Sequence, residues 1–101
     1  MLDINLKTPK DIRLDIAAKA KARRLALDIS QKELAVRSGV SLGSVKRFEA
    51  SGLISLSSLL EIGLVLRQLQ DFDMLFAVPE SPASLFAPEP KKRFRSGRRK
   101  T

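Results

Sequence analysis

The chain has 101 residues, a formal net charge of +8, and neither Cys nor His, so it has room for one small domain without a disulfide framework. There is no His or Cys for acid/base or nucleophilic work or for binding a soft metal, no glycine-rich phosphate loop, and the Ser residues fall at helix caps, so we expect no catalytic residue, no metal and no cofactor. No apolar run approaches the roughly 20 residues that cross a bilayer, so we expect a cytoplasmic protein with no membrane partner.

The amino-terminal arm, residues 1–7, alternates apolar and polar side chains with the period of a short strand. Such a strand would pair with its copy in a dimer, and the alternative is a frayed terminus. Thr8 and Pro9 then supply a hydroxyl cap and a first helical residue whose fixed φ suits a helix. An Ala-rich helix is predicted from Pro9 to about Leu27.

Two short helical patterns follow in residues 31–49. Ser30, with Glu33 three residues later, has the capping-box pattern that starts a helix. Gly39 is expected to end this helix in a left-handed conformation, which a side chain would resist. Ser41 is then expected to cap the second helix.

The second of these helices, residues 42–49, is predicted to have one buried face and one outward face. Val45 and Phe48 are three residues apart, so they point the same way and are expected in the core. The outward face, where a partner would be recognised, is expected to hold Leu42, Gly43, Ser44, Lys46 and Arg47.

A fourth helix is predicted after the break at Gly52, capped by Ser55 or Ser57 and continuing to about residue 69. Its apolar surface is wider than one small core needs, so another chain is expected to cover part of it. Asp71 is predicted to cap a short fifth helix with aromatic residues on one face. The expected homodimer contact uses Leu69, Phe72 and Phe76.

Charge divides the chain into three parts. Residues 1–67 carry 12 basic and 7 acidic residues (+5), residues 68–90 carry 4 acidic and no basic residues (−4), and residues 91–101 carry 7 basic residues (+7). The first part suits a polyanion, the second a protein contact, and the third either. Residues 79–101 contain four prolines and predict a disordered basic tail, in which Phe94 would stack on bases or remain solvated.

The spacing within residues 31–49 resembles the helix-turn-helix of the phage-repressor and xenobiotic-response-element (XRE) family. The resemblance extends over about residues 9–76 and rests on Gln31, Ala35, Gly39, Ser41, Val45, Phe48 and Glu49. It implies an all-α, five-helix, phage-repressor-like (lambda repressor-like) DNA-binding domain over residues 8–78.

Within that family, the chain is most similar to antitoxins of the HipB type. The features that carry this narrower resemblance are the runs SLGSVKRFE and SGLISLSSLLEIGLVL, the acidic-aromatic DFDMLF and the basic tail. The resemblance implies a homodimeric repressor that binds a palindromic operator in double-stranded DNA, controls its own operon and binds a HipA-like kinase toxin. The alternatives are a stand-alone or phage-derived repressor without a toxin, and a protein-binding adaptor with vestigial DNA binding.

The resemblance also assigns residues to DNA. Gln31 would bond a phosphate from the start of its helix, and the alternative is a solvated side chain. Arg47 would fork onto a guanine, and Gly43, beside Ser44 on the base-reading surface, would permit close approach. Leu42 would touch thymine methyl groups or pack in the core.

Phage repressors often have paired amides at the positions of Leu42 and Gly43, and this chain departs from that pattern. Phosphate contacts are expected from Lys32 and Lys46, with the cap residue Ser41 beside them. Arg24 and Glu49 match positions that form an internal ion pair in the family.

Overall fold

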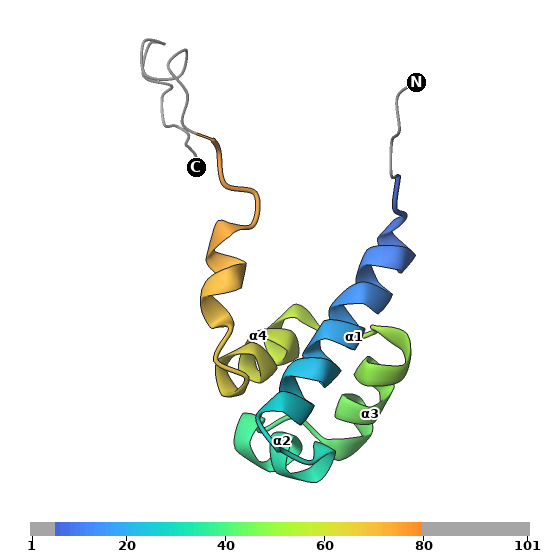
Figure 1. The fold of residues 1–101 in the computed structure, drawn as a ribbon, viewed down its shortest axis with the longest axis vertical. Helices are drawn as coiled ribbons and strands as arrows, with labels where there is room; N and C mark the ends of the chain where they lie inside the picture. The colour runs from blue at the N-terminus through green and yellow to red at the C-terminus, as the bar shows by residue number, and fades with distance from the viewer. Residues whose placement is uncertain (1–5, 80–101) are drawn as a thin grey trace, which may run out of the picture.

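The computed structural model describes residues 6–79, and its regular elements there are all helical (Figure 1). The helices are α1 (Pro9–Ala26), α2 (Gln31–Ser38), α3 (Leu42–Ser51), α4 (Leu56–Val65) and the 3-10 helix η1 (Leu69–Met74). The predicted all-α, five-helix architecture is confirmed. The expected amino-terminal strand and basic tail fall largely or wholly on residues outside the described range.

Helix α1 begins with a reciprocal capping box. The Thr8 hydroxyl accepts a hydrogen bond from the Asp11 amide at 3.1 Å, and the Asp11 carboxylate accepts one from the Thr8 amide at 3.0 Å. The Thr8 amide, and then its hydroxyl, lower the pKa of Asp11. This arrangement satisfies two amide groups that the first turn leaves without helical partners.

Serine and glycine set the limits of α2 and α3. The hydroxyls of Ser30 and Ser41 accept hydrogen bonds from the amides of Glu33 and Ser44. Gly39 and Gly52 end the two helices at φ 77° and 75°, a region that only glycine adopts without strain. The Glu33 side chain does not return to Ser30 as a complete capping box would require, and it pairs with Arg37 within α2.

The core lies where α2 and α3 meet α1 and α4. Its largest fully buried side chains are Phe48, Leu34, Ile62 and Val45. Helix α1 packs against α3, whereas α2 packs against both α3 and α4. Burying side chains of this size contributes about 1.5–3 kcal/mol each, so the α2–α3 pair is held rigidly between its neighbours.

Helix α4 ends earlier than predicted, at Val65. Arg67 adopts a left-handed φ of 63°, and the Gln68 amide donates back to the Gly63 carbonyl, which reverses the chain. The Arg23 guanidinium donates to the Leu66 carbonyl at 3.0 Å, which ties α1 to this end. The apolar sequence pattern continues beyond Val65, but the turn after α4 is fixed by contacts with residues that are distant in the sequence, and the pattern does not show these contacts.

The prediction that Asp71 caps the last helix was wrong. Element η1 begins at Leu69 with no side-chain cap, and Asp71 lies inside it, where its carboxylate accepts a hydrogen bond from the side-chain amide nitrogen (Nε2) of Gln68. The Phe72 ring lies against Gly63, where an added Cβ would come within 2.8 Å of it. Gly63 therefore makes room on α4 for the ring that holds η1.

No single helix within residues 6–79 has the length and apolar composition to cross a bilayer. Helices α3 and α4 have the necessary length and apolar composition only when they are counted together, and their axes are bent by 96° relative to each other.

Candidate nucleic-acid interface

Helix α3 has two contrasting faces. Val45 and Phe48 are completely buried beneath it, as predicted from their spacing. Gly43, Ser44, Lys46 and Arg47 are exposed on the opposite side. A Cβ added at Gly43 would meet no atom within 4 Å, so the backbone is open to close approach there.

Leu42, at the start of α3, is half-buried and packs against the core. The packing alternative for this residue is therefore realised at least in part. The exposed remainder of the side chain is still available for an apolar contact beside Gly43.

An open hollow of about 350 Å³ lies beside the exposed face of α3. Ser44 and Arg47 line it from α3, and Ser55 and Ser58 line it from the start of α4. The position of α4 next to this face does not follow from the sequence pattern, although the cap residue Ser55 marks where α4 begins. Arg47 thus stands between the outward surface of α3 and a helix start that attracts anions.

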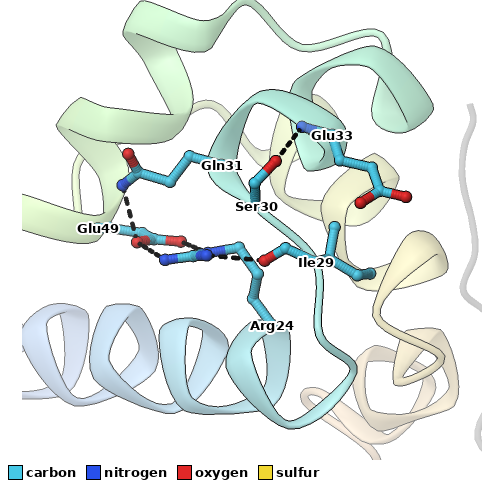
Figure 2. A network of polar contacts seen from close by, with 6 residues as sticks. All are labelled: Arg24, Ile29, Ser30, Gln31, Glu33 and Glu49. Atoms are coloured by element: carbon cyan, nitrogen blue, oxygen red, sulfur yellow. Dashed lines mark hydrogen bonds and ion pairs between the residues drawn. The ribbon is translucent and has the colours of Figure 1, made fainter.

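A buried polar network joins α1, α2 and α3 (Figure 2). The Arg24 guanidinium donates to both carboxylate oxygens of Glu49, at 2.7 and 3.0 Å, and to the Ile29 carbonyl at 2.8 Å. The side chains of Arg24 and Glu49 are only 7% and 5% exposed. The pair has the forked, doubly bonded geometry that strengthens an arginine–carboxylate contact.

The ionised form of Glu49 is favoured inside this network. Burial opposes ionisation, but the hydrogen bonds from Arg24 and Gln31 outweigh it and hold the pKa of Glu49 below its ordinary value. The negative charge is therefore present at neutral pH and balances Arg24.

Gln31, the first residue of α2, belongs to the same network. Its amide nitrogen donates to Glu49 at 3.0 Å, a contact that the sequence analysis missed (Figure 2). An amide nitrogen carries two hydrogens, so one remains to donate to a phosphate. The side chain is half-buried rather than fully solvated, and the phosphate contact stays a prediction.

Residues 21–68 match the helix-turn-helix family model HTH_3. This part of the chain is therefore similar to a helix-turn-helix domain. The match begins within α1, includes α2, α3 and α4, and ends just before η1, a little under half of the chain. The comparisons with curated proteins and with solved structures gave no match. Domains of this family are typical of DNA-binding transcription regulators, and α3 is the second helix of the motif.

The other basic residues of the helix-turn-helix domain differ in their surroundings. Lys32 and Lys46 are exposed on α2 and α3, and phosphate contacts from them stay predictions. Arg37 is held by Glu33 four residues earlier in α2. The hydroxyl of Ser41 is committed to Ser44, accepting from its amide and donating to its hydroxyl at 2.9 Å.

The three residues expected in the dimer contact lie in unlike environments. Phe72 is half-buried against Gly63 of its own chain. Leu69 is exposed on η1, and Phe76, with a left-handed φ of 59°, is completely exposed beyond it. Phe72 therefore has a structural role inside the chain. Of these three residues, Phe76 is the one whose side chain is completely exposed to solvent.

Proposed function

We propose that this protein is a homodimeric, sequence-specific DNA-binding repressor that reads a palindromic operator with α3. The proposal rests on the two faces of α3. On one face Val45 and Phe48 are completely buried, and on the other Lys46 and Arg47 are exposed. A helix anchored in this way presents its outer residues to the major groove in a fixed orientation.

Within this proposal, the outer face of α3 reads bases. Arg47 is assigned to a guanine, because a guanidinium forks onto its O6 and N7 atoms. Leu42 offers an apolar edge to a thymine methyl group, and Gly43 with Ser44 lets the backbone approach.

Phosphate contacts are assigned to the residues that surround this face. They would fix the register of α3 without reading sequence. The assigned residues are Gln31, Lys32 and Lys46, whereas the hydroxyl of Ser41 is already bonded to Ser44 beside them.

Arg47→Ala is expected to weaken binding to the cognate operator by about 1–3 kcal/mol and to relax preference at one base position. Lys46→Ala, on the adjacent residue, is the matched control and should weaken all sequences alike, with a smaller salt slope. Binding to operator and random duplexes at several salt concentrations measures both effects. Equal losses on the two duplexes for Arg47→Ala would remove its base-reading role.

Gln31→Ala should also weaken all sequences alike, but it removes a hydrogen bond to Glu49 as well. Its melting temperature must therefore be measured beside its affinity. A loss of affinity at an unchanged melting temperature assigns the residue to phosphate.

The proposed dimer places Phe76 in the contact between copies. Phe76→Asp is expected to give monomers in sedimentation and to reduce operator binding, since each protomer would hold only one half-site. Val36→Asp on α2 is the control for oligomeric state, because Val36 is also an exposed apolar residue and lies in a different element. If the Phe76 variant stays dimeric at all concentrations, the ring is not part of the contact.

We further propose that the repressor is the HipB-like antitoxin of a type II pair and binds a HipA-like kinase toxin. The acidic segment of residues 68–90, between basic parts of the chain, supports a protein contact separate from the DNA surface. Affinity purification from the native host with mass spectrometry tests this. A co-purifying kinase-like protein supports the antitoxin, and its absence leaves a stand-alone repressor.

A protein-binding adaptor is the second candidate. It is favoured by the Leu42-Gly43 pair, which lacks the amides that form forked contacts with adenine. An adaptor would bind operator and random DNA with equal, weak affinity.

A further inference from the structure

An apolar groove of about 450 Å³ lies between the amino-terminal half of α1 and the start of α4. Its lining is mainly Pro9, Ile12, Ile16, Phe48, Ile54 and Leu59. Ile12 and Ile16 are 44% and 38% exposed along this groove. Two isoleucines four residues apart on one helix, with an apolar floor beside them, form a surface suited to an apolar partner.

The end of η1 and the segment after it expose apolar side chains. Met74, the last residue of η1, is exposed, as are Leu75, Phe76 and Val78 after it, and Phe76 is 100% exposed. The ring therefore makes no contact with the groove of its own chain. Figure 1 shows why: the segment rises from one side of α4, and the amino-terminal half of α1 rises from the other.

The two features differ in net charge. Arg13 lines the groove, and Lys19 is three residues after Ile16, on the same side of α1. The acidic Asp15, three residues after Ile12, is paired with Lys7, so the surroundings of the groove stay basic on balance. Asp71 and Asp73 are exposed on η1, directly before the apolar segment. Basic groups beside the groove and acidic groups beside the segment favour this pairing in preference to contact between two identical segments.

We propose that the groove between α1 and α4 receives residues 75–78 of a second copy of this chain, with Phe76 as the side chain that enters it. The inference rests on the homodimer of the proposed function and adds the place where the ring binds. Exchange in both directions gives a closed two-fold contact, in which each copy supplies one segment and one groove. Both apolar surfaces are then covered.

Introduced cysteines test the contact in the full chain, which has no Cys of its own. Ile12→Cys and Phe76→Cys are prepared separately, mixed and oxidised. A disulfide needs Cα atoms within about 7 Å, so a covalent heterodimer should form only if the two residues meet across the contact. Its rate should be roughly tenfold or more above that of the control mixture of Val36→Cys with Phe76→Cys, because the paired thiols have a high effective concentration.

Four outcomes would overturn the inference. A Phe76→Cys homodimer in place of the mixed product would put segment against segment. A monomeric disulfide, formed at every dilution in a chain that carries both Ile12→Cys and Phe76→Cys, would mean that the segment returns to its own groove. No mixed product, with dimers still present in sedimentation, would leave the proposed dimer standing and place its contact elsewhere. Monomers of the unmodified protein in sedimentation would overturn the dimer as well.

Discussion

Glu49→Ala is expected to lower the free energy of unfolding by about 3–5 kcal/mol, because it strands the buried charge of Arg24. The carboxylate receives both arms of the guanidinium and the Gln31 amide in a site that is almost closed to water. Urea denaturation followed by circular dichroism measures the loss.

The control for this variant is Asp15→Ala, which breaks the ion pair with Lys7. Those two side chains are 41% and 44% exposed, so water screens them and the variant should change stability little. Equal losses for the two variants would show that burial of the Arg24–Glu49 pair is not what makes it matter. A double replacement of Arg24 and Glu49 by apolar residues should recover much of the loss, since no charge is then left alone.

The same pair should make stability depend on pH in a defined direction. The pKa of Glu49 in the folded protein is below its ordinary value of 4.5. The ionised carboxylate therefore contributes fully to the free energy of unfolding above pH 4.5. This contribution is lost as the pH falls through the lower pKa of the folded protein. The difference in stability between the unmodified protein and Glu49→Ala should therefore narrow under acid conditions below pH 4.5 and remain constant near neutrality.

Gly52→Ala is expected to be among the most damaging small substitutions in the domain. Gly52 has a φ of 75°, and an added Cβ would lie 2.5 Å from the Cγ of Arg13 and 2.6 Å from its backbone oxygen. The left-handed conformation costs a side chain about 1–2 kcal/mol, and overpacking against the α1 backbone adds about 1–3 kcal/mol. A lower denaturation midpoint measures the sum.

Gly39→Ala separates those two effects. Gly39 has a nearly identical φ of 77°, but an added Cβ there would meet nothing within 4 Å. Only the conformational cost should remain at this position, so the loss should be about 1–2 kcal/mol. Equal losses at Gly39 and Gly52 would mean that α1 moves aside at no cost.

Features that depend on a few neighbouring residues could be predicted from the sequence. The caps at Ser30 and Ser41, the left-handed Gly39 and the buried faces of Val45 and Phe48 follow from local hydrogen bonding and helical spacing. The spacing after Gln31 also predicted the two short helices α2 and α3 and the turn between them.

Features that depend on distant contacts could not be predicted in this way. The end of α4 is set by a left-handed Arg67 and by the bond from Arg23, 43 residues away from Leu66 in sequence. The role of Phe72 depends on a space at Gly63, and the bond from Gln31 to Glu49 depends on how α2 meets α3. Periodicity shows which face of a helix is apolar, but it does not show which element covers that face.

The buried face and the exposed face of α3 are expected to differ in how freely their residues change during evolution. Gly43, Lys46 and Arg47 project away from the core, and exposed positions of this kind usually accept substitution within about 0.5 kcal/mol of stability. Under the proposed function, lineages would acquire new operators by changing Gly43 and Arg47 while the fold stays intact, and a change at Lys46 would alter affinity for all sequences alike. Leu42 is different, because it packs against the core beside the same surface. A new operator that required a polar group there would evolve only together with a repacked interior.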